Sequence, residues 1–226
     1  MKRFCVRYWL SITLVSGAAV CILLIGFTPA GQRLAWVALN RLHGDSTVSA
    51  DALHAAQSRL RQAVGDDELV LPLPDARIVI DKSERRLSLY DGERLIKTYR
   101  VGLGSHSEGD KQREGDRRTP TGNYHVCTRL KRSQYHLFLG LNYPNADDAR
   151  IALSENHIGA ELAAELERAE KNHKQPAWDT ALGGAIGIHG GGCKYDWTLG
   201  CIALEDFAIE ELWVSTRYWT PVRIEE

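Results

Sequence analysis

The sequence predicts a mainly β fold, α+β overall, for the chain from residue 75 onward. Short runs in which apolar and polar residues alternate begin at Ala76 and return at intervals up to the last residues. One segment among them, residues 158–174, has the composition and periodicity of a surface helix. Residues 1–30 and 31–74 lack the alternation, so we expect three regions: an N-terminal transmembrane helix, a short helical linker, and a β domain at residues 75–226.

The overall composition fits one substantial domain with accessory segments. The chain has 226 residues, and 44% of them are hydrophobic, which is ordinary for a protein with a packed core. The formal net charge is −1 at pH 7. Nucleic-acid-binding proteins usually carry a strong basic excess, so we expect no nucleic-acid partner.

The N-terminus has the pattern of a membrane span. Lys2, Arg3 and Arg7 precede residues 8–32, which contain no charged residue. About 20 apolar residues suffice for a helix that crosses a bilayer, and basic residues before such a helix keep the N-terminus in the cytoplasm. We therefore expect an inner-membrane anchor, with the rest of the chain in the periplasm. A secretory signal cleaved near residue 30 is the alternative, but the length of the apolar run favours the anchor.

The next segment, residues 31–74, is predicted to be a helical linker or stalk. Apolar residues recur at spacings of three and four over residues 31–42 and 50–64, as they do in amphipathic helices. Pro72 and Pro74 then mark a junction with the β domain. The segment carries no chemical motif.

The β domain opens with a predicted hairpin. Two alternating runs occupy residues 76–81 and 86–90, and a turn at Asp91–Gly92 leads into a third run over residues 94–103. The remaining elements are, in chain order, a polar loop at residues 104–121, strands at 123–130 and 136–144, the helix at 158–174, a strand ending at His189, a strand starting at Cys201, a helix at 207–216 and a final strand at 221–226.

His189 and Cys201 carry the chemistry that the sequence predicts. His189 ends an apolar strand and precedes three glycines, and Cys201 directly follows Gly200 at the start of another apolar run. If the two strands are neighbours, an imidazole base meets a thiol nucleophile. Gly200 allows a tight turn that can aim the amides of Leu199, Gly200 and Cys201 at an oxyanion, where one donor is worth about 3 to 4 kcal/mol. The pattern predicts thiol acyl transfer.

The protonation states of this pair decide its reactivity. A free thiol has a pKa of about 8.5, and a nearby imidazolium would lower the pKa of Cys201 and favour its thiolate. His189 would give its proton to the leaving amine and then deprotonate the acceptor. The group that orients the ring is either the backbone carbonyl of Gly190 or the carboxylate of Asp196.

Other roles for the cysteines stay open. Cys127, Cys193 and Cys201 lie after the apolar run, and an odd number of thiols in an oxidising compartment leaves at least one unpaired. Cys193 and Cys201 could form a disulfide that silences the nucleophile. With His189 they could also be metal ligands, but no CxxC pair and no fourth ligand accompany them, so we expect no metal. Taken alone, Cys201 and His189 could each be structural.

Four sequence blocks resemble the L,D-transpeptidase catalytic domain (YkuD) family. The sequences IHG at residues 188–190 and TLGCIAL at 198–204 match its His-Gly and Ser/Thr-x-Gly-Cys signatures. Residues 109–124 and 135–145 look like its YafK/ErfK-like Gram-negative branch. The resemblance covers residues 76–226.

This resemblance implies a β-sandwich catalytic domain with a helical insertion, which modifies peptidoglycan in the periplasm through a cysteine thioester. Cys201 matches the nucleophile, and His189 matches the general acid and base. The matching residues around them are Gly190, whose carbonyl orients His189, and the turn of Thr198, Leu199 and Gly200 before the nucleophile.

The implied substrates are peptidoglycan stem peptides, and no cofactor is implied. Transfer to an amine would give a crosslink or attach a wall-linked lipoprotein, whereas transfer to water would make the protein an amidase of the same bonds. A non-catalytic peptidoglycan-binding module is the alternative from another class. Two departures bear on the acceptor: Leu199 stands where the family often has histidine, and the spacing from His189 to Cys201 is shorter than is common.

Three aromatic residues are candidates for the substrate groove. Tyr135 and Tyr143 lie in one of the family-like blocks, and Trp197 precedes the nucleophile by four positions. Aromatic residues beside strands are core residues at least as often as they are ligand contacts.

Overall fold

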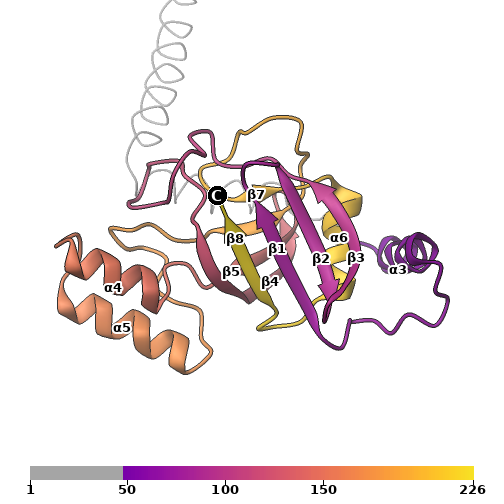
Figure 1. The fold of residues 1–226 in the computed structure, drawn as a ribbon, viewed down its shortest axis with the longest axis horizontal. Coiled ribbons are helices and arrows are strands. Elements are labelled where there is room, and N and C mark those ends of the chain that lie inside the picture. Colours follow the sequence, from indigo (N-terminus) through magenta and orange to yellow (C-terminus); the bar gives the residue numbers. More distant parts are fainter. Residues whose placement is uncertain (1–47) are drawn as a thin grey trace, which may run out of the picture. The chain divides into compact units, whose positions relative to one another are not determined.

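The computed structural model of the protein describes residues 48–226. The predicted membrane anchor and the predicted helix at residues 31–42 lie outside this range. Within it, the first helix is followed by five strands, then by two helices, two strands, one helix and a final strand (Figure 1). None of the described helices is long and apolar enough to cross a membrane.

Eight strands build one curled sheet. Their bounds are β1 Ala76–Asp81, β2 Arg86–Asp91, β3 Arg94–Arg100, β4 Gly122–Ser133, β5 His136–Leu141, β6 Gly187–His189, β7 Ile202–Ala203 and β8 Pro221–Glu225. Across the sheet the order is β3-β2-β1-β8-β4-β5-β6-β7. Neighbouring strands are antiparallel, except that β1 and β8 are parallel, as are β6 and β7. The mainly β fold predicted from the alternating runs is confirmed.

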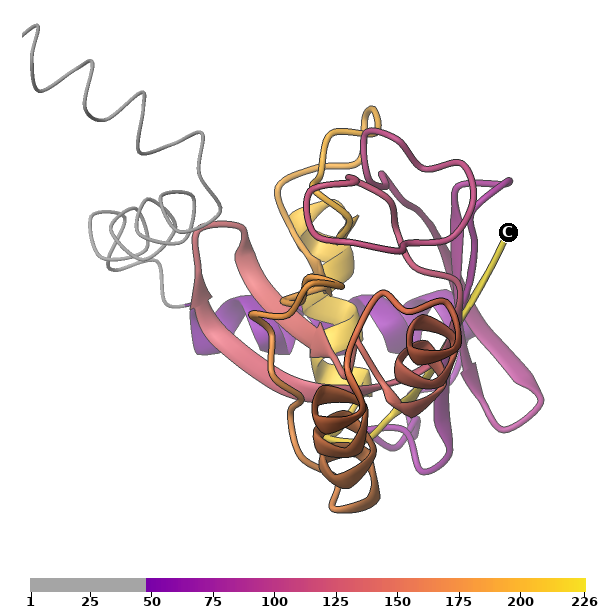
Figure 2. The ribbon, with the colours of Figure 1, turned by 90° about the vertical axis from the view of Figure 1, so that its left-hand side faces the viewer.

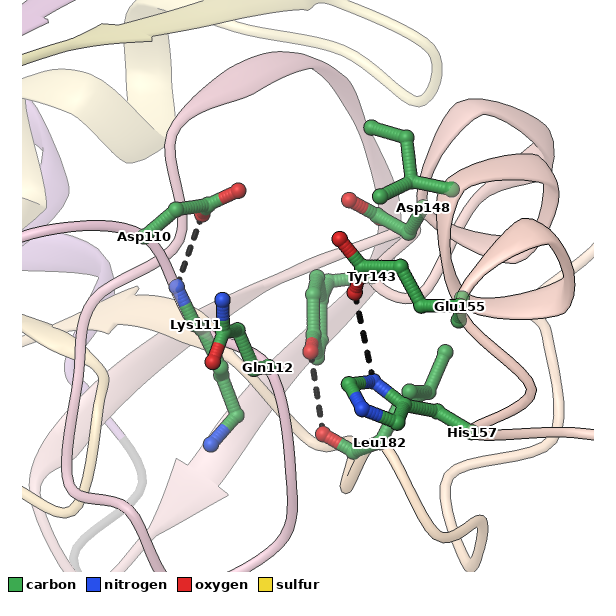
Figure 3. A pocket seen from close by; sticks show the side chains of 10 residues that line it. Asp110, Lys111, Gln112, Tyr143, Asp148, Glu155, His157 and Leu182 are labelled. Carbon is green, nitrogen blue, oxygen red and sulfur yellow. Dashed lines mark hydrogen bonds and ion pairs between the residues drawn. The ribbon is translucent and has the colours of Figure 1, made fainter.

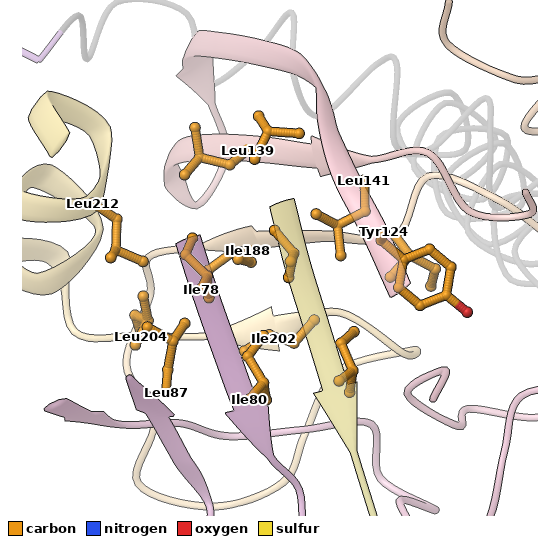
Figure 4. Close-up of a cluster of buried hydrophobic side chains, with 14 of the residues drawn as sticks. Ile78, Ile80, Leu87, Tyr124, Leu139, Leu141, Ile188, Ile202, Leu204 and Leu212 are labelled. Atoms are coloured by element: carbon orange, nitrogen blue, oxygen red, sulfur yellow. The ribbon is translucent and has the colours of Figure 1, made fainter. Parts of the chain in front are cut away.

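The long strand β4 joins the two halves of the sheet. Its first residues, 122–125, pair with β8, and residues 126–133 pair with β5. The two halves enclose one apolar core, in which Ile78 of β1 and Ile188 of β6 are both buried (Figure 4). The sheet edge that carries β6 and β7 is therefore held by the same core as the first hairpin.

Helix α3 (Ala50–Val64) confirms the helix predicted at residues 50–64. Ser49 caps its start by accepting a hydrogen bond from the amide of Ala52 (3.1 Å), and Gly65 ends it with φ +64°. Ala56 and Leu60 are fully buried in the core. This helix packs on α6 (Asp206–Ser215), which confirms the helix predicted at residues 207–216.

Helices α4 (Ala146–Ser154) and α5 (Ala160–Lys171) pack side by side at the opposite end of the sheet from α3 (Figures 1 and 2). Helix α5 confirms the predicted insertion, whereas α4 is not predicted. Its buried face consists of alanines, so it lacks a marked apolar stripe. A capping box between Asn145 and Asp148 starts it.

Candidate active site

Strands β6 and β7 bring His189 and Cys201 to one edge of the sheet. The two strands are parallel, with Ile188 opposite Ile202 and His189 opposite Ala203. Side chains on one face of a strand recur every second residue. Cys201, two positions before Ala203, therefore lies on the face that carries His189. The predicted base thus ends β6, and the predicted nucleophile directly precedes β7 on the same face.

Thr198 fixes the turn that leads into Cys201. Its hydroxyl donates to the carbonyl of Cys201 (2.7 Å) and accepts from the amide of Gly200 (3.1 Å). Gly200 has φ +134°, and a Cβ at this position would lie 2.6 Å from the carbonyl oxygen of Arg118. Only glycine fits such a backbone. The turn is therefore held on both sides of the Cys201 amide, while Leu199 is 62% exposed.

The carbonyl of Gly190 contacts the ring of His189. Its oxygen lies 2.6 Å from Nδ1, so Nδ1 carries a proton and donates it, which leaves Nε2 as the acceptor nitrogen. The carboxylate of Asp196 is engaged elsewhere, since it accepts from Arg85 Nη2 (2.9 Å) and from the amide of Leu103 (2.9 Å). Of the two orienting groups that the sequence left open, the Gly190 carbonyl is the one at the ring.

Burial keeps both reactive groups uncharged at neutral pH. It lowers the pKa of His189 to about 4, although the bond to Gly190 favours the protonated ring. Burial also raises the pKa of the Cys201 thiol to about 11, and the Gly187 amide and the Lys111 ammonium offset this only in part. With these pKa values the resting pair is a neutral thiol and a neutral imidazole, which differs from the thiolate and imidazolium expected from the sequence.

Two aromatic rings enclose the imidazole. The ring of Tyr135 stacks on His189 with centroids 4.6 Å apart and planes 24° apart. Trp197 meets the same ring edge-on at 5.6 Å, and its Nε1 donates to the carbonyl of Gly192 (3.0 Å). Burial and the proximity of Cys201 raise the pKa of Tyr135. Tyr135 and Trp197 thus lie against the ring of His189.

Cys193 contacts Glu205 and is not joined to Cys201. All three described cysteines, the third being Cys127, are free thiols. The sulfur of Cys193 lies 3.6 Å from the Glu205 carboxylate, which also accepts from the Cys193 amide (3.3 Å). Among residues 48–226, no group of three His, Cys, Asp or Glu side chains is arranged to hold a metal ion.

The sequence profile of the L,D-transpeptidase catalytic domain, YkuD, matches residues 75–224. The chain belongs to this family. Among curated proteins, none matches the sequence.

Solved structures to which the chain is similar include a cell shape determining protein, the protein Bd1075 and an L,D-transpeptidase. The helical cell shape determining protein Pgp2 of Campylobacter jejuni is 23% identical with a TM-score of 0.45, and the match covers 76% of this chain and 55% of that one. Bd1075 of Bdellovibrio bacteriovorus is 24% identical with a TM-score of 0.42, covering 67% and 48%. The L,D-transpeptidase of Xylanimonas cellulosilytica is 13% identical with a TM-score of 0.40, covering 75% and 69%. The chain spans about half the length of the first two.

In this L,D-transpeptidase domain Tyr143 is a core residue, so its place among the substrate-groove candidates is corrected. It is 1% exposed, and its hydroxyl donates to the carbonyl of Leu182 (2.9 Å). The strand before it, β5, is buried on both faces over most of its length, and Tyr143, two residues beyond its end, faces the core as well.

Two hollows lie elsewhere on the domain. One, of about 50 Å³, lies between the polar loop and α4, where Asp110, Asp148 and Glu155 gather (Figure 3). The other, of about 350 Å³, is lined by residues of α3 and α6 such as Leu53 and Trp213. Neither hollow is lined by His189 or Cys201.

Several residues that the sequence did not single out support the loop after His189. The carboxylate of Asp206, at the start of α6, accepts from the amide of Gly191 (2.8 Å). His136, which directly succeeds Tyr135, contacts Glu210 of α6 through Nε2 (2.9 Å). No periodicity or motif marks these residues, because each contact joins positions far apart in the sequence.

Proposed function

We propose that the protein is an L,D-transpeptidase that transfers an acyl group between peptidoglycan stem peptides through a thioester on Cys201. The observation that carries the proposal is the placement of Cys201 and His189 on one face of β6 and β7, with Gly190 holding the ring so that Nε2 is the acceptor. A thiol, a base and turn amides are the groups that acyl transfer requires.

In the first half of the proposed reaction, the Cys201 sulfur attacks the carbonyl carbon of the donor peptide while His189 Nε2 takes the thiol proton. Because both groups are neutral at rest, proton transfer accompanies formation of the carbon–sulfur bond. The amides of Leu199 and Cys201 are the proposed oxyanion donors, since the Gly200 amide already donates to Thr198. The carbon–nitrogen bond then breaks, the departing amine takes the proton from His189, and a thioester remains.

In the second half, an amine of another stem peptide or of a wall-linked protein is the proposed acceptor. His189 removes a proton from this amine as its nitrogen attacks the thioester carbonyl. The carbon–sulfur bond breaks, and the proton returns to Cys201. Leu199, two positions before Cys201, is exposed, and the rings of Tyr135 and Trp197 lie against His189. This apolar surface favours an organic amine over water as the group that reaches the thioester.

Incubation with muropeptides that contain tetrapeptide stems tests this function. Wild-type protein should give crosslinked products and a mass adduct on Cys201, and Cys201→Ala should give neither. Cys193→Ala is the matched control, because it removes a thiol that contacts Glu205 and not the site, and it should keep the products. Identical products from wild type and Cys201→Ala would refute the proposal. Products shortened by hydrolysis without crosslinks would assign water as the acceptor.

We also propose that the domain works in the periplasm, anchored by the apolar run at residues 8–32. Stem peptides lie there, and basic residues before the run favour export of the chain beyond it. A periplasm-dependent reporter fused after Glu226 should be active, and the full-length mass should be found in the membrane fraction. A mass reduced by the first 30 or so residues would indicate a cleaved signal, and reporter activity confined to the cytoplasm would contradict export.

A further inference from the structure

A chain of polar contacts runs from α3 to the turn between β4 and β5. Arg59 of α3 donates through Nη2 to Glu210 Oε2 of α6 (2.9 Å). The other oxygen of Glu210 lies 2.9 Å from Nε2 of His136. The two oxygens of this carboxylate thus bind partners from two elements, and the Glu210 side chain is 11% exposed.

The carboxylate of Glu211, next to Glu210, fixes Arg59 at the start of this series of contacts. Glu211 is fully buried and accepts from Arg59 Nε (2.9 Å), from Lys97 Nζ (2.7 Å) and from the hydroxyl of Tyr99 (2.9 Å). A buried carboxylate with several donors holds them in one geometry, because losing a partner leaves an uncompensated charge. The guanidinium of Arg59 is therefore fixed between Glu211 and Glu210.

The last residue in this series of contacts, His136, lies next to Tyr135, which contacts the segment that carries His189. His136 has φ +69°, a left-handed conformation that a non-glycine residue keeps only when its surroundings hold it. The preceding residue, Tyr135, accepts from the Gly190 amide through its carbonyl (3.0 Å) and stacks its ring on His189. Gly190 in turn binds His189 Nδ1. The placement of His136 therefore sets two contacts to the segment of His189.

We propose that Arg59, Glu210 and His136 are positioning residues for the catalytic histidine, acting by holding the β4–β5 turn and the Tyr135 ring against His189 and Gly190. Arg59 lies outside residues 75–224, the range that matches the family. Helix α3 is therefore part of the machinery that aligns the active site. The inference rests on the proposed function for the role of His189 as the base.

Two adjacent substitutions in the full chain, Glu210→Gln and Glu211→Gln, separate positioning from folding. Both weaken the contacts of Arg59, but only Glu210 touches His136. Glu210→Gln should lower kcat for acyl transfer by about 10- to 100-fold, because a small displacement of a catalytic group has that effect, with KM changed by less than about twofold. Glu211→Gln, which changes the more deeply buried carboxylate, should lower the melting temperature more. It should lower kcat less than Glu210→Gln does, because Arg59 keeps its bond to Glu210, and Glu210 keeps its contact with His136.

A second pair of substitutions, at His136, tests the contact between His136 and Glu210. His136→Gln keeps an N–H donor that can reach Glu210, and His136→Leu removes it. His136→Gln should keep most of the wild-type kcat, whereas His136→Leu should behave like Glu210→Gln. Equal losses in the two variants would contradict a role for the hydrogen bond.

An NMR measurement keeps the test independent of turnover. A stacked aromatic ring displaces the resonances of the His189 ring protons, so these should move in Glu210→Gln and in His136→Leu and move less in Glu211→Gln. Unmoved resonances in all variants, with kcat following thermal stability alone, would overturn the positioning role. If the resonances move as expected and wild-type protein transfers no acyl group, the proposed function fails, while Glu210 and His136 still set the contact of Tyr135 with His189.

Discussion

At the scale of single residues, the burial of Cys201 sets the pH at which it reacts as a thiolate. Burial raises the pKa of this thiol to about 11, and the thiolate is the species that alkylating reagents attack. The rate of alkylation of Cys201 by iodoacetamide should therefore keep rising with pH through the neutral and mildly alkaline range. Mass spectrometry of the peptide that contains Cys201 measures this rate.

His189→Gln is the control for the alkylation experiment. Since the lowered pKa of His189 keeps its ring neutral at pH 7, the substitution should leave the pH profile nearly unchanged. A rate that is constant from about pH 6 to 8 in wild type and falls in His189→Gln would instead show a thiolate stabilised by an imidazolium.

Gly200 is the residue at which the turn before the nucleophile tolerates least change. In Gly200→Ala the new Cβ would lie 2.6 Å from the Arg118 carbonyl oxygen, so the turn and its amides must shift. We expect acyl transfer to fall by about 100-fold or more, the typical cost of losing an oxyanion donor. Gly115→Ala is the matched control, because Gly115 also has positive φ (+79°) but open space around its Cα; it should cost about 1 kcal/mol of stability and little activity. Equal activities would show that the turn absorbs the methyl group.

At the scale of elements, α4 shows how much a cap contributes where the apolar stripe is weak. The side chain of Asn145 accepts from the amides of Asp147 and Asp148. Asn145→Ala should lower the free energy of unfolding by about 1 kcal/mol for the cap, and by more because the Nδ2 bond to the Asn123 carbonyl is also lost. Asn145→Asp keeps an oxygen for the cap but loses the same bond, so it should recover only part of the loss. Chemical denaturation measures both, and acyl transfer should be unchanged, since α4 contributes no residue to the site. A loss of activity in Asn145→Ala would link this helix to catalysis.

The strands show which elements the sequence can predict and which it cannot. Strand β1 occupies the predicted residues because its side chains alternate between buried and half-buried positions. Strand β6 is shorter than the apolar run that predicts it, since Gly183 and Ala185 have positive φ and keep the chain out of the sheet. Strand β7 is also short, because Glu205 already forms the N-cap of α6.

The residues of the site also fall into those that the sequence can predict and those that it cannot. The His189 and Cys201 pair and the turn of Thr198 and Gly200 lie close together in the chain, so a local pattern reveals them. The contacts of Glu210 join it to Arg59 and His136 across 151 and 74 positions. No local pattern carries that information, because the sheet order and the packing of α3 on α6 bring these residues together.

At the scale of the whole molecule, two groups oppose each other in the pH dependence of stability. Burial lowers the pKa of His189 from 6.5 to about 4. Burial, together with the nearby carboxylates of Asp110 and Asp147, raises the pKa of Asp148 from 3.8 to about 7. Between the two pKa values of His189 the unfolded chain binds more protons than the folded protein, so the His189 contribution to the free energy of unfolding rises with pH. Between the two pKa values of Asp148 the folded protein binds more protons, so the Asp148 contribution falls with pH. Over the shared range from about pH 4 to 6.5 the two contributions largely cancel.

Removing either group should expose the contribution of the other. His189→Gln leaves the Asp148 contribution, so its free energy of unfolding should fall relative to wild type as the pH rises from about 4.5 to 6.5, while that of Asp148→Asn should rise over the same interval. One pKa unit corresponds to about 1.4 kcal/mol, so urea denaturation at several pH values resolves both trends. The double variant should regain the weak pH dependence of wild type, because titrations common to all four proteins drop out of the comparison. If all four proteins show the same dependence on pH, these two side chains titrate alike in the folded and unfolded states, and His189 is no longer a base kept neutral by burial.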